Sequence, residues 1–356
     1  MPKKRLLSSY EAINEATIIA IKRDKNVYVI GEGVNDPKEI FGTTKDLKKI
    51  FGKKRVIETP ISENGMTGLC IGSAMMGLKP IQIHQRVDFA LLALEQIVNN
   101  CAKAFFISNS KHIVPIVIRL IIGRGWGQGP MHSQILDSLF AQIPGLKVIM
   151  PSFPKDFKGM MLSSIKDPNP VVILEHRWLH NMKGHVPQKY YLQNINKIRK
   201  IKKGKDLTIV ANGYNLLEVL EIQKILNKDG ISFDLFDLNV IQPLDTSSII
   251  NSVKKTGRII VIDSGFKNLG IGSEIISRIS ETCMEKLKSK PVRIGLPFIP
   301  TPSTRFLANN YYPNKKTILF AILDILKKNN HKKRLLNKLK TNIPVDVPDL
   351  NFKGPF

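Results

Sequence analysis

The sequence predicts an α/β protein of two domains, each a mainly parallel sheet flanked by helices. Short apolar runs alternate with longer stretches of helical period, and this alternation is typical of parallel sheets. A polar, basic segment at 183–205 divides the alternation into two blocks. The 356 residues, 43% of them hydrophobic, can fill two cores. We expect domains at 1–190 and 206–330, a linker at 191–205 and a basic, proline-containing tail at 331–356.

The first block is expected to open with a helix, because Ser8 and Glu11 have the spacing of a capping box. Small residues dominate the segment 65–78, as in a helix packed closely against a neighbour. Periodicity predicts helices at 65–78, 91–106, 132–142 and 156–165. It predicts strands at 26–30, 55–59, from residue 80, and at 115–122, 147–150 and 171–174, with a glycine-rich loop at 123–130.

The second block repeats the alternation on a smaller scale. Strands are expected at 207–211, 232–238, 258–262 and 292–296, and helices at 215–228, 246–255 and 271–287. After about residue 330 the chain is rich in lysine and then punctuated by proline, without periodicity. We therefore expect a second α/β domain followed by a tail.

Three features bear on where the chain resides. The longest apolar stretch, 113–122, contains Arg119 and is far shorter than the roughly 20 residues needed to span a bilayer. The basic N-terminus is followed by polar residues, where a signal peptide would need an apolar core. Cys70, Cys101 and Cys283 are widely separated, without metal-ligand spacing or a disulfide framework. We expect a cytoplasmic protein with no membrane span.

The net charge of +25 raises the question of nucleic acid, because clustered Lys and Arg bind phosphates. The excess is mostly lysine, concentrated at 197–205 and 327–340 without interleaved aromatic residues for base stacking. Solvated faces or an acidic partner explain this pattern, and we expect no nucleic acid.

Two predicted strand ends lead into acidic residues, Glu32 and Glu63, and ligands of α/β sheets usually lie at strand ends. Glu63 also precedes the helix of small residues. Loss of water in such an apolar setting would disfavour the charged carboxylate, so that Glu63 could donate a proton. Alternatively, Glu63 merely caps the following helix. Spacing alone leaves both interpretations open.

The segment 55–65, RVIETPISENG, resembles the stretch that contains the cofactor-activating glutamate in β subunits of pyruvate and branched-chain 2-oxo acid dehydrogenases. The resemblance covers most of residues 10–325. It continues through DF at 88–89, EQI at 95–97, HSQ at 132–134, PGLKV at 144–148, DPNPV at 167–171 and PLD at 243–245. It implies a transketolase-like pyrimidine-binding domain followed by a transketolase C-terminal-like domain.

The resemblance implies that Glu63 hydrogen-bonds the aminopyrimidine of thiamine diphosphate, that Phe89 stacks on this ring and that Glu32 lies beside the cofactor. It places His132 at the mouth of the active site, to help transfer an acyl group to a lipoyl arm. On the residues alone, Phe89 could be a core aromatic and His132 a capping or core imidazole. The family's structural potassium site would fall on Ile116, Ser164, Ile165, Asp167 and Asn169.

Some positions depart from the family pattern. His84-Gln85-Arg86 and the loop 123–128 differ from pyruvate-type sequences, and Ile83 replaces a common acidic residue. These loops are expected to face substrate. Arg86 or Arg124 could pair with a substrate carboxylate or phosphate, because an arginine fork suits either group.

Thiamine diphosphate also needs a Mg²⁺-dependent diphosphate site, marked in this superfamily by Gly-Asp-Gly followed by an Asn-Asn pair. The sequence lacks this motif, and its nearest counterparts, at 31–33 and 263–265, lack the asparagines. The resemblance therefore implies an α subunit that holds Mg²⁺ and the diphosphate. We expect an α2β2 heterotetramer that is active only when assembled.

The sequence is compatible with three functions. The leading hypothesis is the β subunit of a pyruvate dehydrogenase-like enzyme of the EC 1.2.4 class, which decarboxylates a small 2-oxo acid and passes the acyl group to a lipoyl acyltransferase. The second is half of a split transketolase-like enzyme that acts on sugars or sugar precursors without a lipoyl carrier. The third is a catalytically idle basic binding module, which the presence of Glu63 and Phe89 disfavours.

Overall fold

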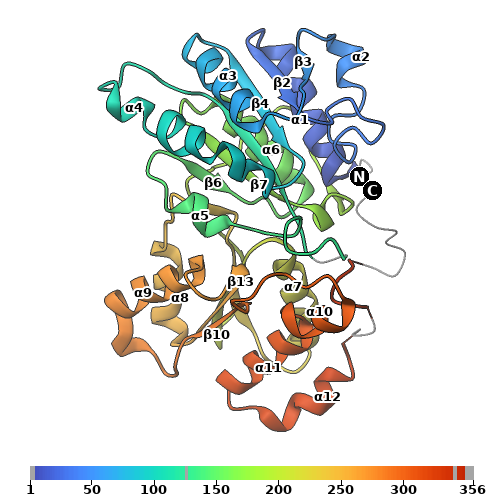
Figure 1. Ribbon diagram of the computed structural model, residues 1–356. Helices are drawn as coiled ribbons and strands as arrows, with labels where there is room; N and C mark the ends of the chain where they lie inside the picture. The colour runs from blue at the N-terminus through green and yellow to red at the C-terminus, as the bar shows by residue number, and fades with distance from the viewer. Residues whose placement is uncertain (1–4, 125–126, 340–342, 349–356) are drawn as a thin grey trace. The chain divides into compact units, whose positions relative to one another are not determined.

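The computed structural model describes residues 5–124, 127–339 and 343–348 (Figure 1). The chain divides into two compact units, the first formed by Met1–Gly123 with Leu139–Ile195 and the second by Arg124–Ser138 with Asn196–Pro355. The break after Ile195 lies inside the segment 191–205 that was predicted as a linker. Residues 124–138 differ from the prediction, because they belong to the second unit rather than to the first.

The first unit is built on parallel strands in the order β6-β7-β5-β4-β2-β3. Their bounds are β2 Val27–Gly31, β3 Val56–Glu58, β4 Lys79–His84, β5 Val117–Ile122, β6 Lys147–Ile149 and β7 Val171–His176. Every residue of β5 is buried, as expected for a central strand covered on both faces. The carboxyl ends of all these strands share one edge of the sheet.

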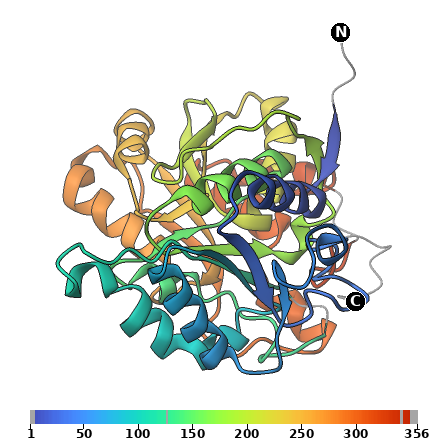
Figure 2. The same cartoon turned by 90° about the horizontal axis from the view of Figure 1, so that it is seen from above.

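Helices cover both faces of this sheet. In Figure 2, α1 and α6 lie on one face and α3 on the other. The bounds are α1 Ser9–Arg23, α2 Leu47–Phe51, α3 Glu63–Met75, η1 Phe89–Ala93, η2 Gln96–Cys101, α4 Ala104–Ile107, α6 Pro154–Lys166 and η3 Arg177–Leu179. A small antiparallel pair joins β1 Leu6–Ser8 to β8 Lys183–His185. The predicted capping box is confirmed, because the Ser8 and Glu11 side chains each accept the other's backbone N–H.

Two predicted helices differ from the structure. The segment 91–106 is not one helix but the succession η1, η2 and α4, of which η2 is a π-helix. The helix predicted at 132–142 is shorter, α5 Asp137–Ala141. Leu136 has a φ of 53°, and this left-handed conformation prevents the helix from starting earlier.

The second unit contains a five-stranded sheet in the order β14-β13-β10-β11-β9. Its strands are β9 Arg199–Lys202, β10 Leu207–Ala211, β11 Phe233–Asp237, β13 Ile259–Phe266 and β14 Val292–Leu296, with β12 Val240–Gln242 outside this sheet. Only β9 runs antiparallel. Its helices are α7 Gly213–Asn227, α8 Ser247–Thr256, α9 Ile271–Cys283, η4 Met284–Lys286, α10 Arg305–Tyr311, α11 Lys315–Ile325, η5 Asn329–His331 and α12 Lys332–Leu336.

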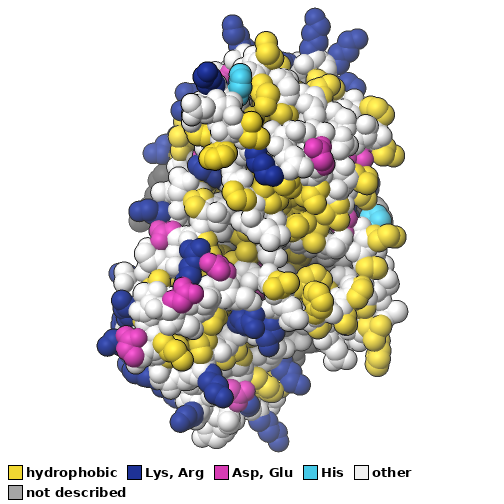
Figure 3. Space-filling view, turned by 60° about the vertical axis from the view of Figure 1, so that its left-hand side comes forward, with side chains coloured by type: hydrophobic (Ala, Val, Ile, Leu, Met, Phe, Trp, Pro, Cys, Tyr) yellow, Lys and Arg dark blue, Asp and Glu magenta, His cyan; other side chains and the backbone are white. Residues whose placement is uncertain are grey.

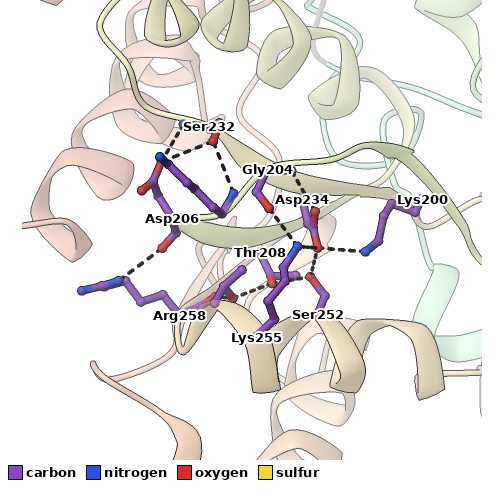
Figure 4. A network of polar contacts seen from close by, with 11 residues as sticks. Lys200, Gly204, Asp206, Thr208, Ser232, Asp234, Ser252, Lys255 and Arg258 are labelled. Carbon is purple, nitrogen blue, oxygen red and sulfur yellow. Dashed lines mark hydrogen bonds and ion pairs between the residues drawn. The ribbon is translucent and has the colours of Figure 1, made fainter.

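Strand β9 was predicted as part of the linker, and a buried aspartate explains why it joins the sheet. Asp234, on β11, is fully buried and accepts hydrogen bonds from Lys200 Nζ at 2.8 Å and Lys255 Nζ at 2.9 Å (Figure 4). Ser252 Oγ and the Gly204 backbone N–H donate to the same carboxylate. Lys200, which was predicted in a solvated linker, thus helps to neutralise a buried charge.

No helix among the described residues is both long and apolar enough to cross a bilayer.

Candidate functional site

The carboxyl edge of the first sheet gathers three glutamates. Glu32 follows β2, Glu58 ends β3, and Glu63 is the first residue of α3. The Glu58 carboxylate accepts the backbone N–H groups of Gly33 at 2.5 Å and Asn35 at 2.8 Å. Glu58 therefore braces the loop that carries Glu32. Because β2 and β3 are parallel neighbours, this loop and the start of α3 meet at one edge.

Glu63 lies close enough to Glu32 for its charge to act on the Glu32 carboxyl group. Glu63 is only 6% exposed. Burial raises the pKa of Glu32 above its ordinary value, the charge of Glu63 raises it further, and the Ser62 backbone N–H that donates to Glu32 opposes the shift. Oε1 of Glu32 has no hydrogen-bond partner. The charged form of Glu32 is therefore disfavoured beside Glu63.

The first turn of α3 is a favourable place for the Glu63 carboxylate, as the capping alternative required. Behind it, a buried chain of polar groups fixes the helix on the sheet. Thr67 Oγ1 donates to the Glu63 carbonyl at 2.7 Å, and Gln82 Nε2 reaches Thr67 Oγ1 at 2.6 Å. Gln82 also contacts His84 Nε2 at 2.9 Å, and burial lowers the pKa of His84 to about 4. This imidazole is therefore neutral at physiological pH, and the backbone at Glu63 is firmly held.

Phe89 begins η1, which packs against α3. Asn64, the residue after Glu63, joins the two segments, because its side chain donates to the Leu92 carbonyl at 3.5 Å and accepts from Gln96 Nε2 at 3.3 Å. Phe89 is partly exposed rather than fully buried. Its side chain is therefore not completely enclosed in the core.

The two candidate arginines have different surroundings. Arg86 follows β4 and is 5% exposed, with its guanidinium carbon 5.2 Å from the centre of the Phe41 ring. Arg124 belongs to the second unit, where it donates to the Pro313 carbonyl at 2.6 Å and lies 3.7 Å from Glu218 Oε2. Arg124 is thus held by groups of its own unit, whereas Arg86 remains at the edge that carries Glu32.

His132 is half-buried and lies in irregular chain before α5, not in the expected helix. It falls in the segment 124–138, which is part of the second unit, whereas Glu63 is in the first. Trp126, in the glycine-rich loop, lies outside the described residues.

The residues expected at a potassium site lie around the end of α6 and the turn that follows it. Asp167 Oδ1 accepts both the backbone and the side-chain N–H groups of Asn169, and its Oδ2 lies 2.5 Å from Lys147 Nζ. The Ile116 carbonyl accepts the Val171 N–H at 2.9 Å. The remaining members, Ser164 and Ile165, are in α6. The carbonyls suit a monovalent cation, but Lys147 already supplies positive charge to the carboxylate.

Sequence reasoning missed Arg177, which directly follows β7 at the same edge. It is 8% exposed, and its guanidinium carbon lies 4.3 Å from the centre of the Phe41 ring. A charged residue directly after an apolar strand was the available signal. That signal was not used because β7 was predicted to end at Leu174.

Comparison with known proteins agrees with this architecture. Residues 7–182 match the family model for the transketolase pyrimidine-binding domain, and residues 196–318 match the model for the transketolase C-terminal domain. A solved split-gene transketolase, described as an inactive β4 tetramer, has a TM-score of 0.72 at 20% identity, covering 91% of this chain and 99% of that chain. The fold and the site thus define a two-domain protein of the transketolase type.

Curated relatives narrow the class. The chain is 38% identical to the pyruvate dehydrogenase E1 component subunit beta of Porphyra purpurea, over 89% of this chain and 96% of the relative. In Bacillus subtilis it is 35% identical to the beta subunit of acetoin:2,6-dichlorophenolindophenol oxidoreductase (90% and 98% covered) and 35% identical to that of 2-oxoisovalerate dehydrogenase (85% and 95%). The chain belongs to the family of β subunits of 2-oxo acid dehydrogenase E1 components.

Proposed function

We propose that this chain is the β subunit of a thiamine-diphosphate-dependent 2-oxo acid dehydrogenase, in which Glu63 binds the aminopyrimidine of the cofactor. The observation that carries the proposal is the buried Glu63 at the carboxyl edge of the sheet, with Glu32 beside it. When bound, thiamine diphosphate would supply the electron sink for decarboxylation of a 2-oxo acid.

The chain's own residues have three tasks in this proposal. Glu63 exchanges a proton with a ring nitrogen of the aminopyrimidine, and Glu32 keeps that proton available because its own charged form is disfavoured. Phe89 packs on the ring with its open surface. His132 assists acyl transfer to a lipoyl group carried by an acyltransferase.

An α subunit would hold Mg²⁺ and the diphosphate in an α2β2 assembly. Two observations support the need for this α subunit. The sequence lacks the diphosphate motif, and apolar side chains are exposed on the surface near the candidate site. Helix α3 and the segments η1 and α4 expose large apolar side chains, and Figure 3 shows apolar side chains gathered on one face. The exposed set includes Leu69, Met76, Leu92, Phe106 and Ile107. Large exposed apolar side chains in such number are typical of a protein interface.

The test is co-expression with an α-type chain that carries the Gly-Asp-Gly and Asn-Asn motif, followed by assays of 2-oxo acid decarboxylation. Glu63→Gln should lower kcat by about 100-fold or more, the typical contribution of a positioned acid or base, while the heterotetramer still assembles. Glu285→Gln, which removes an exposed carboxylate, is the matched control. Full turnover by Glu63→Gln would refute the role of this residue. Turnover of sugars but not of 2-oxo acids would identify the split transketolase-like alternative.

A further inference from the structure

Arg177 is a buried cation that lacks a counter-ion. It is 8% exposed, and no described residue forms a hydrogen bond or ion pair with its guanidinium group. The guanidinium carbon lies 4.3 Å from the centre of the Phe41 ring. Burial lowers the pKa of Arg177 to about 10, and the neighbouring charge of Arg86 contributes to the shift. Nε of Arg177 is shielded from solvent without a hydrogen-bond partner. A largely buried guanidinium with no counter-ion destabilises a protein unless something else pairs with it.

Arg86 concentrates positive charge at the same place. The guanidinium groups of Arg86 and Arg177 both contact Phe41. Arg86 follows β4 and Arg177 follows β7, and these two strands flank β5 at the carboxyl edge of the sheet. The backbone at Phe41 has a rare conformation. Glu39, Ile40 and Phe41 have positive, left-handed φ angles of 46°, 47° and 57°, respectively. Such strained segments persist where the surrounding structure holds them in place.

The acidic groups nearby do not cancel this charge. The negative charge of Asp88 acts on Arg86 and raises the pKa of its guanidinium group. Glu175, on β7, is already paired with Arg119 at 2.5 and 2.9 Å and bonded to His180. Burial lowers the pKa of His180 to about 4, so that it adds no charge of its own at neutral pH. None of these groups is a counter-ion of Arg177, whose pKa is affected by the positive charge of Arg86 and by burial alone.

We propose that Arg177 and Arg86, braced by Phe41, form a binding site for a carboxylate or phosphate group carried by the substrate. Guanidinium groups bind both anions through paired hydrogen bonds, and a poorly hydrated setting strengthens the attraction. This site deepens the proposed function, on which its role in catalysis rests, because it specifies a substrate with an anionic group besides the one at its reacting end.

The position suits such a substrate. Arg86 follows the strand next to β2, and Arg177 follows a strand three places from β2 in the sheet. With strands about 4.8 Å apart, the strand ends that lead to Glu32 and Arg177 are separated by roughly 14 Å along the edge. A cofactor ring and a short extended substrate would together fill that span.

The first experiment uses the full-length chain alone, with inorganic phosphate as the probe. Phosphate at constant ionic strength should raise Tm saturably, by roughly 2–4 °C at ten times its Kd. Arg177→Gln should abolish this shift, whereas Arg23→Gln, which removes an exposed arginine of the same unit, should keep it. An unchanged shift in Arg177→Gln, or no saturable shift in the unaltered chain, would overturn the site.

Stability without phosphate gives an independent readout. Because Arg177 is buried without a counter-ion, Arg177→Gln should raise Tm in phosphate-free buffer. A lower Tm would mean that Arg177 serves packing and would contradict the proposal. Neither experiment needs an α subunit, so failure here leaves the proposed function standing, and failure of the proposed function leaves these results intact.

The assembled enzyme identifies the source of the anion. Arg177→Gln should raise KM at least tenfold for substrates with a second carboxylate or a phosphate, and should leave KM unchanged for substrates with an uncharged tail. Assembly with the α-type chain should be unaffected. If the variant instead weakened assembly and had no effect on KM, the anion would be an acidic side chain of the partner, and the substrate assignment would be wrong.

Discussion

Replacing Glu175 by glutamine should destabilise the first unit strongly, because Arg119 would remain buried in the core without its counter-ion. Both side chains are almost fully buried, and Arg119 Nε and one terminal nitrogen contact the two carboxylate oxygens at 2.5 and 2.9 Å. Burial opposes ionisation of Glu175, but the charge and hydrogen bonds of Arg119 outweigh it and lower the pKa of Glu175 to about 2, from 4.5. Glutamine keeps the shape of the side chain but removes its charge.

The expected magnitude follows from two estimates. A depression of this size corresponds to about 3 kcal/mol at neutral pH, and breaking a buried pair by removing one partner typically costs 3–5 kcal/mol. The folded state lowers this pKa, so the stabilisation is present above pH 4.5 and is lost as pH falls toward 2. The difference between the unaltered chain and Glu175→Gln should therefore shrink in the same window.

Urea unfolding at pH 7 and at several acidic pH values measures both effects. Glu285→Gln, an exposed control, should change the free energy of unfolding by less than about 0.5 kcal/mol. Adding Arg119→Met to Glu175→Gln should recover part of the loss, since the stranded charge is removed. A loss below about 1 kcal/mol in the single variant at pH 7 would refute the reasoning.

Two further outcomes are expected. Burial and the neighbouring Asp263 raise the pKa of Asp137 well above its ordinary value, so this carboxyl group destabilises the fold as pH rises past about 3.8. Asp137→Asn should therefore raise the free energy of unfolding at pH 7, by about 1.4 kcal/mol per unit of pKa shift. The increase should be smaller at pH 4. An equal gain at both pH values would count against this cause. Replacing choline chloride by KCl should raise Tm if potassium binds only the folded chain around Asp167 and Ile116. An unchanged Tm would contradict the potassium site that the family resemblance implies.

Much of the fold could be predicted because its signals are local. The capping box at Ser8, the apolar run that became β5 and the alternation of both blocks each depend on neighbours in sequence. The failures were of a different kind. Lys200 looked like part of a solvated linker because its partner, Asp234, is 34 residues away in sequence. The helix expected at 132–142 was shortened by the left-handed backbone at Leu136, which an apolar period does not reveal.

The site divides in the same way. Glu32 and Glu63 could be proposed as site residues because strand ends and a motif mark them. Arg177 could not be ranked above the chain's many other basic residues, because its importance lies in lacking a counter-ion, which is a property of the folded surroundings. Arg124 had the right chemistry but is held by Pro313 and Glu218, and no pattern within the 123–128 loop predicts those partners.

The assignment of residues 124–138 to the second unit has a consequence for dissecting this protein. The polypeptide passes from one unit to the other after Gly123, returns at Leu139 and leaves again after Ile195. A fragment truncated at Ile195 would retain Ile135 and Asp137, both buried in the intact chain, without the body that shelters them. Each unit is therefore formed by two separate segments of the chain. Cleavage at a single peptide bond would not separate them into two complete units.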